Sequence, residues 1–248
     1  MMRDIQESLA WKLTHGAAEL GIRLDENQTA QFMLYLRELK EWNQKVNLTA
    51  ITEDDDVIQK HFLDSLTVLP LIPGGVATVL DIGTGGGLPG IPLKIVRPEL
   101  AVYLMDAIRK KAEFLTFLNQ KLGYDMKILN MRAEDAGQSP DYREQFDWVI
   151  SRAVADMAVL AEYSLPLVKI GGIFCAMKGK DVDDEVKNAR YAVKVLGGRL
   201  IEIVHVQVPG TDLIRHCIMV EKVQPTPAKY PRKAGMPEKR PLVSVNKV

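Results

Sequence analysis

The sequence predicts an α/β protein with a doubly wound, mostly parallel sheet of seven strands, an antiparallel last strand and an N-terminal helical extension. Two observations lead to this prediction. From Val76 onward, short apolar runs of strand length alternate with amphipathic stretches of helix length, which is typical of parallel sheets covered by helices. The last two strand-like runs, 199–208 and 217–223, have no helix between them. We therefore expect a hairpin that closes the sheet with an antiparallel edge.

The chain before residue 76 carries only helical patterns. Apolar residues recur at about one-turn spacing in three stretches, 4–20, 25–42 and 52–70. Asp25 and Gln28 have the spacing of a capping box. Thr52, followed by three acidic residues, has the pattern of an N-cap whose first turn suits the helix dipole. We expect residues 1–75 to be a helical extension that ends in a short linker.

Residues 76–223 alternate between the two periodicities and form the predicted α/β domain. Its strands are expected at 76–82, 102–105, 127–131, 146–151, 173–177, 199–208 and 217–223, and its helices include 111–122, 157–168 and 183–196. Residues 224–248 hold five of the thirteen prolines and six Lys or Arg residues against one acid. Because proline lacks a backbone donor, we expect no regular element in this basic tail.

The strand-like run at 76–82 leads straight into a glycine-rich turn. Glycines follow it at positions 83, 85, 86, 87 and 90, and they allow positive φ and a close approach of ligand to backbone. Pro89 and Pro92 suit the first turn of a following helix. This order of strand, glycine turn and helix predicts a nucleotide-type ligand at the carboxyl end of the first strand.

Two cofactors compete for this turn. Residues 85–90 match G-x-G-x-x-G, the dinucleotide fingerprint of NAD domains. Residues 81–87 also match D-x-G-x-G-x-G, which resembles the first motif of methyltransferases that use S-adenosylmethionine (SAM). Asp81 favours SAM, because a carboxylate there can meet its cationic amino-acid end but would repel a pyrophosphate. A tight turn without a ligand is the remaining reading.

Residues at the ends of later strands are candidates for cofactor contact, because parallel strand ends line one crevice. Asp106 follows the second strand and can accept hydrogen bonds from ribose hydroxyls, which both SAM and NAD carry. Ala133 and Glu134 follow the third strand, where the backbone of Ala133 could bind adenine. Arg152 follows the fourth strand and could bind the SAM carboxylate or a substrate phosphate. For each residue, a solvated side chain or a surface ion pair is the alternative.

Further residues are candidates for substrate contact. His61 and Asp64 lie about one turn apart on the third helix and could touch a substrate base. Lys178 ends the fifth strand and could meet a phosphate. Arg232 and Lys233 lie in the basic tail, next to a tyrosine that could stack on a base. A structural histidine, a solvated cation and a disordered tail are the respective alternatives.

Composition narrows the classes of protein. The chain has 248 residues, 47% of them hydrophobic, and a formal net charge of zero, so any surface for nucleic acid must be local. Cys175 and Cys217 lie in apolar runs and are expected to be buried free thiols. No apolar run is long enough for a membrane span, no signal peptide stands out and no His or Cys has metal-ligand spacing. We expect a cytoplasmic protein without a bound metal.

Several motifs together resemble one family, the bacterial 16S ribosomal RNA guanine-N7 methyltransferases, also called glucose-inhibited division protein B. The resemblance covers essentially the whole chain. The motifs are 42–43 with 47–51, 61–66, 81–92, 151–153 and 231–235. Met236 stands where many relatives have threonine. Each motif is weak alone, but the set is specific.

The resemblance implies methyl transfer from SAM to N7 of one guanine, position 527, in 16S ribosomal RNA. It implies SAM contacts at Gly83, Leu88, Ala133, Glu134 and Arg152. It also places the residues from Asp106 through Ala107 to Ile108 along the ribose and adenine, and we add Gly85 of the glycine turn. The expected partner is 16S rRNA or the 30S particle, and we expect a monomer. An NAD-dependent oxidoreductase, a non-catalytic ribosome-assembly factor and a methyltransferase of protein or small molecules are the rival functions.

Overall fold

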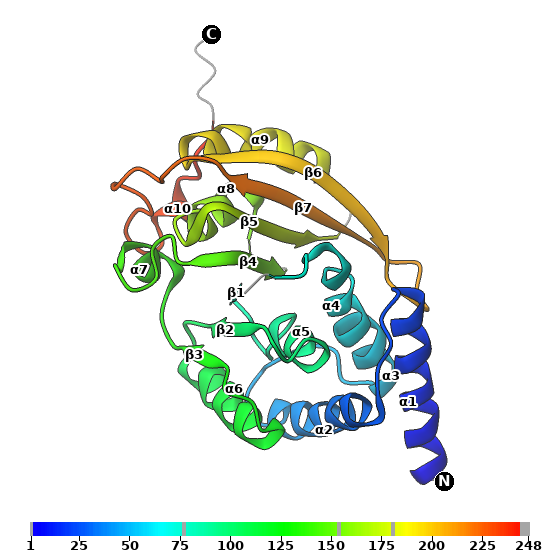
Figure 1. The fold of residues 1–248 in the computed structure, drawn as a ribbon. Helices are drawn as coiled ribbons and strands as arrows, with labels where there is room; N and C mark the ends of the chain where they lie inside the picture. Colours follow the sequence, from blue (N-terminus) through cyan, green and yellow to red (C-terminus); the bar gives the residue numbers. More distant parts are fainter. Residues whose placement is uncertain (1, 76–77, 153–154, 180–181, 244–248) are drawn as a thin grey trace.

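The computed structural model describes residues 2–75, 78–152, 155–179 and 182–243. Seven strands form one sheet: β1 (Thr78–Ile82), β2 (Ala101–Met105), β3 (Lys127–Leu129), β4 (Phe146–Arg152), β5 (Val168–Lys178), β6 (Gly198–Gln207) and β7 (Ile214–Lys222). Their order is β3-β2-β1-β4-β5-β7-β6, and β7 runs antiparallel to both of its neighbours. This is the predicted doubly wound sheet, with its antiparallel last strand (Figure 1).

Helices cover both faces of the sheet (Figure 1). Before β1 lie α1 (Met2–Glu19), α2 (Glu26–Asn43), α3 (Asp54–Val57), the π-helix η1 (Ile58–Leu63), α4 (Asp64–Leu66) and the 3-10 turn η2 (Leu69–Leu71). After it come α5 (Gly90–Val96), α6 (Arg109–Leu122), α7 (Ala133–Gln138), α8 (Met157–Ser164), α9 (Val182–Val195) and α10 (Met236–Lys239). Elements α1 to α6 share one hydrophobic cluster, whereas α7, α8 and α9 share a second one.

The central strands are buried on both faces. In β5, Phe174 and Ala176 belong to the cluster of α7 to α9, whereas Cys175 and Met177 belong to the cluster of α1 to α6. All four side chains have no exposed surface. This alternation explains why these strands have continuous apolar sequences, since side chains point to opposite faces in turn and both faces are covered.

The N-terminal helices pack against the sheet through the same cluster as α5 and α6. The ring of Phe62 in η1 packs at a tilt against Phe32 and Tyr35 of α2, with ring centroids 5.2 and 4.9 Å apart. The predicted capping box is confirmed, because the backbone N–H groups of Asp25 and Gln28 donate to each other's side chains. The division of the chain into residues 1–75, 76–223 and 224–248 stays a prediction.

The largest boundary differences from the sequence prediction lie between α8 and β5. Helix α8 ends at Ser164 and β5 begins at Val168, so the helix predicted over 157–168 was too long. Gly171 and Gly172, which follow the predicted helix, lie inside β5. A Cβ on Gly172 would come within 2.7 Å of the Asp147 carbonyl oxygen. Glycine is needed there for the close approach of two strands.

The third helical pattern was also only partly right. Thr52 is not the N-cap; Glu53 occupies that position and makes no side-chain capping bond. The predicted single helix is divided into α3, η1 and α4, with a π-helix in the middle. A wider turn of this kind is often found at functional sites, and His61 lies in it.

The tail is more ordered than its composition predicts, and the expectation of no regular element was wrong. Residues 236–239 form α10, which packs on α8. Arg232 anchors the segment, because its guanidinium and backbone N–H donate to the buried carboxylate of Glu162. Contacts with the rest of the protein, such as this ion pair, hold the tail in a structure that its proline-rich sequence does not favour locally.

Two smaller expectations concern the thiols and the membrane. Cys175 and Cys217 are buried and free, as predicted. Among the described residues, no helix combines the length and the apolar character that crossing a bilayer requires.

Gly197 and Gly171 give a matched test of this packing. Both have positive φ, +86° and +83°, but a Cβ on Gly197 would lie 2.2 Å from the Gln224 carbonyl oxygen, whereas one on Gly171 would meet nothing within 4 Å. Gly171→Ala should cost about 1 kcal/mol of unfolding free energy from backbone strain alone. Gly197→Ala should cost about 1 to 3 kcal/mol more, because backbone must move. Urea unfolding measures the free energy of unfolding of both variants. Equal losses would contradict the close approach of Gly197 to the Gln224 carbonyl oxygen.

Candidate cofactor and substrate site

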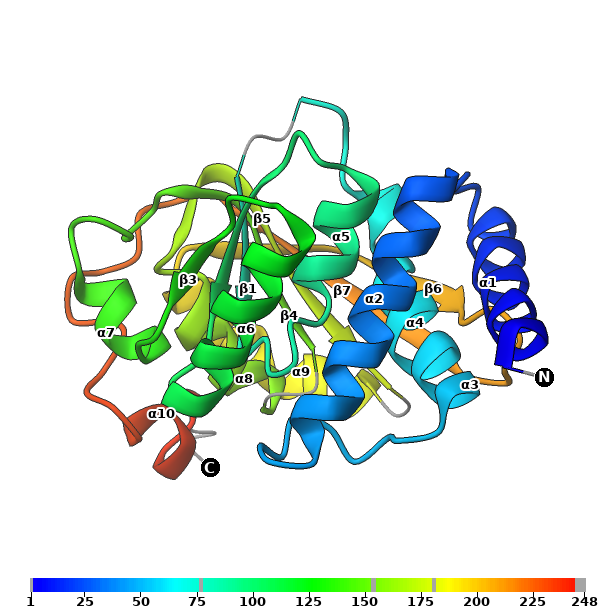
Figure 2. The ribbon, with the colours of Figure 1, turned by 90° about the horizontal axis from the view of Figure 1, so that it is seen from below.

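The carboxyl ends of four neighbouring strands bring the predicted cofactor residues together. Gly83, Asp106 and Ala133 follow β1, β2 and β3, and Arg152 ends β4. Because parallel strands point the same way, these residues meet along one edge of the sheet. Figure 2 shows this edge towards the bottom of the view, with α10 on one side and α3 on the other.

Two carboxylates hold the glycine turn in place. Oδ2 of Asp81 accepts hydrogen bonds from the Thr84 hydroxyl at 2.6 Å and from the Gly90 N–H at 2.8 Å. Oδ2 of Asp106 accepts a hydrogen bond from the Gly85 N–H at 3.0 Å. Gly83, Gly85 and Gly87 all have positive φ, which side chains with a Cβ rarely adopt. The turn is therefore held by carboxylates at the ends of β1 and β2.

The second carboxylate oxygen of Asp81 is unusual. Asp81 has no exposed surface, and its Oδ1 has no hydrogen-bond partner among the described residues. Burial raises the pKa of Asp81 to about 6, although the hydrogen bonds from Thr84 and Gly90 and the charge of Arg152 act in the opposite direction. A buried acceptor without a donor is costly, so this atom is suited to receive a hydrogen bond from a cationic ligand group.

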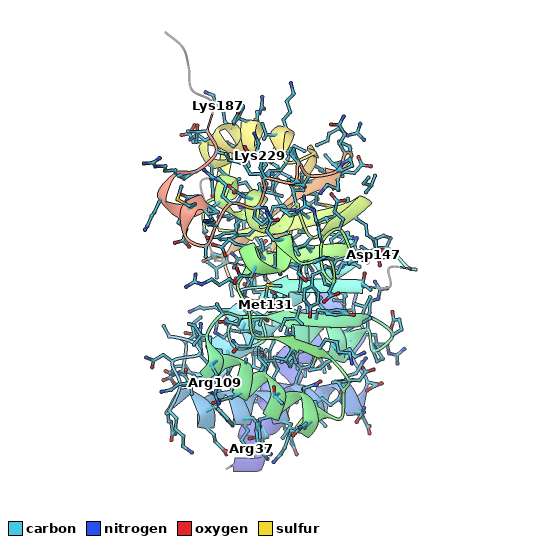
Figure 3. All side chains as sticks on the ribbon, turned by 90° about the vertical axis from the view of Figure 1, so that its left-hand side faces the viewer. Arg37, Arg109, Met131, Asp147, Lys187 and Lys229 are labelled. Carbon is cyan, nitrogen blue, oxygen red and sulfur yellow. The ribbon has the colours of Figure 1, made fainter. Side chains whose placement is uncertain are left out.

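A hollow of about 130 Å³ lies beside the glycine turn. Its walls come from the ends of β1, β2 and β3, together with α8 and α10. Oδ1 of Asp106 accepts from the Ile108 N–H at 2.9 Å, which fixes this carboxylate at the mouth of the hollow. Met131, another lining residue, lies well away from Asp147 at the opposite end of the strands (Figure 3).

Arg152 belongs to a buried ion cluster with Asp64 and Arg215. Its Nη1 lies 2.8 Å from Oδ2 of Asp64, whose side chain is only 1% exposed. Arg215 of β7 approaches the same carboxylate with Nε at 2.6 Å and Nη2 at 2.7 Å. Asp64 thus joins the N-terminal helices to two strands and orients the Arg152 guanidinium at the sheet edge.

His61 lies beside this cluster and is nearly buried. Its Nε2 lies 2.6 Å from the Thr49 hydroxyl, and its Nδ1 lies 3.1 Å from the Lys60 carbonyl oxygen. Burial, and then the charge of Arg152, lower the pKa of His61 to about 4. The imidazole is therefore neutral at neutral pH.

The other predicted site residues are distributed along the same edge. Lys178 pairs with Glu185 at 2.6 Å, and Arg232 pairs with Glu162 at 2.6 Å. Glu134 accepts from the Gly235 N–H at 2.8 Å, and the remaining tail candidate, Lys233, is exposed. The structure thus gives most of these residues partners within the protein, and their contacts with cofactor or substrate stay predictions.

Sequence reasoning missed two residues that shape the site. Arg215 is separated from Asp64 by 151 residues, and a single arginine in a strand gives no signal of a distant partner. Tyr35, fully buried in α2, donates from its hydroxyl to the Gly86 carbonyl oxygen at 2.5 Å. Its position on the apolar face of the helix indicated burial but not contact with the glycine turn.

The described residues contain no group of three or more His, Cys, Asp or Glu side chains that could hold a metal ion. The absence of a metal from the protein stays a prediction.

Comparisons with known proteins agree with this geometry. A family model described as GidB, rRNA small subunit methyltransferase G, matches residues 28–216. Proteins named ribosomal RNA small subunit methyltransferase G are similar over most of their length. The one from Acetivibrio thermocellus is 46% identical over 231 residues, which cover 93% of this chain and 95% of that protein. The one from Pelotomaculum thermopropionicum is 48% identical over 236 residues, which cover 94% and 99%.

A solved structure from work on the conversion of a disulfide bond into a thioacetal group in echinomycin biosynthesis is similar in fold. It has a TM-score of 0.51 and 14% identity, over 65% of this chain and 81% of that one. Similarity at this level of identity shows the fold alone. With the family match over most of the sequence, the conclusion is direct: the chain belongs to the GidB family, rRNA small subunit methyltransferase G.

Proposed function

We propose that this chain transfers a methyl group from SAM to N7 of a guanine in 16S ribosomal RNA, the base that the family resemblance identifies as position 527. The observation that carries the proposal is the glycine turn above Asp81, whose buried Oδ1 is without a donor among the described residues. An ammonium group supplies the missing donor and a compensating charge. A dinucleotide pyrophosphate at the same place would meet a negative charge.

The site residues fit the parts of SAM. Asp81 would hold its amino group, and Asp106 would accept hydrogen bonds from its ribose hydroxyls. The main chain at Gly83, Gly85 and Leu88 would lie along one side of SAM. The stretch from Ala107 to Ile108, with Ala133 and Glu134, would enclose the adenine. When bound, SAM supplies a methyl group on a positively charged sulfur.

The chemistry at guanine N7 needs no general base. N7 has an exposed lone pair and carries no proton, so no side chain has to remove one. The neutral His61, whose pKa is lowered to about 4, is consistent with this, since it would be a weak base. The protein then has to align the reactants and compensate charge, which accounts for large rate effects without proton transfer.

Arg152 is the positioning candidate for this alignment. Its guanidinium lies at the strand edge and is 10% exposed, so it can still meet a carboxylate or a phosphate. His61, Asp64 and Lys178 stay candidates for substrate contact beside it. Lys233 and the exposed Lys239 and Arg240 of the tail would attract RNA phosphates.

We also propose that the partner is 16S rRNA or the 30S particle, that the enzyme is a monomer and that it works in the cytoplasm, where ribosomes are assembled. The relatives are named for ribosomal RNA, which favours this substrate over protein or small molecules. A non-catalytic assembly factor would not need Asp106 at the wall of a hollow beside the glycine turn.

Methyl transfer with mapping tests the function. Purified protein is incubated with SAM labelled in the methyl group and with either 30S particles or naked 16S rRNA. We expect label at a single guanine, sensitive to borohydride and aniline, which cleave the chain at N7-methylguanine. Label on protein, on another base atom or nowhere would contradict the proposal.

Arg152→Ala tests the positioning role. We expect methyl transfer to fall by at least about 100-fold, because misalignment of reactants is costly. The fold should persist, since Arg215 still pairs with Asp64. Single-turnover assays and circular dichroism measure the two effects.

Arg199→Ala provides the matched control, because Arg199 is 69% exposed and pairs only with Glu221 among the described residues. This variant should transfer methyl groups like the unmodified protein. Near-normal turnover of Arg152→Ala would refute the role of Arg152.

A further inference from the structure

We propose that the C-terminal tail completes the cofactor pocket and that Glu238 selects a nucleobase with a 6-amino group. The inference rests on the proposed function, which places adenine in the hollow beside Asp106. It concerns a different segment of the chain, because Glu238 lies in the C-terminal tail, far along the sequence from the ends of β1, β2 and β3.

The tail reaches the hollow through a series of anchored contacts. Arg232 is held by Glu162 of α8, with Nη2 2.6 Å from Oε2. Three residues later, the Gly235 N–H donates to Oε1 of Glu134 at 2.8 Å. Since Glu134 is in the first turn of α7, this bond fixes the tail against the end of β3. Helix α10 begins at the next residue and carries Glu238 to the wall of the hollow.

The Glu238 carboxylate is oriented by Tyr163. The Tyr163 hydroxyl donates to Oε1 of Glu238 at 3.2 Å, and both residues line the hollow. Burial and the carboxylates of Glu134 and Glu238 raise the pKa of Tyr163, so the phenol keeps its proton and remains a donor. Glu238 is exposed, and its Oε2 receives no hydrogen bond from the described residues, so this oxygen is accessible as an acceptor.

A carboxylate at this wall discriminates between purines. Adenine carries an amino group at position 6 and can donate to it, whereas a 6-oxo purine presents an oxygen that the carboxylate repels. When a bound purine covers this carboxylate from water, an analogue that cannot donate leaves the carboxylate unpaired and binds more weakly. Glu134 also lines the hollow and, like Glu238, has one carboxylate oxygen engaged within the protein.

The test compares two ligands that differ at position 6, S-adenosylhomocysteine and S-inosylhomocysteine, by isothermal titration calorimetry on the full-length protein. The unmodified protein should bind the adenosyl ligand at least about tenfold more tightly. In Glu238→Gln this preference should fall at least about fivefold, because an amide can accept from an amino group or donate to a 6-oxo group. Glu221→Gln, which changes a carboxylate on β7 near the other end of the sheet, should keep the preference.

The outcomes separate this inference from the proposed function. If S-adenosylhomocysteine does not bind the unmodified protein, the proposed function fails. If it binds and Glu238→Gln keeps the original preference, or weakens both ligands equally, the role of Glu238 is overturned. A reduced preference in Tyr163→Phe, with unchanged thermal stability, would support the orienting hydrogen bond.

Discussion

A buried carboxylate with one satisfied and one unsatisfied oxygen is the constraint on which the site depends. Oδ2 of Asp81 fixes the hydroxyl of Thr84 and the N–H of Gly90, so it closes the turn between β1 and α5. Oδ1 has no donor within the described chain. Burial of such an atom destabilises the free protein, and a bound cation would relieve that cost. The fold thus keeps the Asp81 carboxylate incompletely hydrogen-bonded, and a cationic ligand would stabilise it.

The N-terminal helices complete the site as well as covering the sheet. The Tyr35 hydroxyl supports the glycine turn by donating to the Gly86 carbonyl oxygen. Asp64 links the end of β4 to β7 through Arg152 and Arg215. These contacts come from α2 and α4, so the extension helps to set the geometry on which methyl transfer depends. The C-terminal tail performs a similar task on the other side, where it packs on α7 and α8.

The sequence was sufficient for the sheet and for the location of the site, because both follow from local patterns. Alternating periodicity identified the strands, and strand ends must share one edge. Long-range pairing was not predictable. Asp64 and Lys178 are charged residues at plausible sites, yet their partners Arg215 and Glu185 are chosen by the fold, which no local pattern reveals. The start of β5 was missed because paired glycines commonly end helices, whereas here Gly172 permits the close approach of two strands.

The pH dependence of SAM affinity tests the central role of Asp81 most directly. The pKa of Asp81 is raised to about 6, and a cationic ligand group binds the ionised form, so affinity should decrease as pH falls through this value. Between about pH 7.5 and about pH 5 we expect a loss of about tenfold, while His61, with a pKa of about 4, stays neutral. Asp81→Asn should bind weakly and without this dependence. Tight binding by Asp81→Asn, or an affinity of the unmodified protein that does not change with pH, would contradict the account.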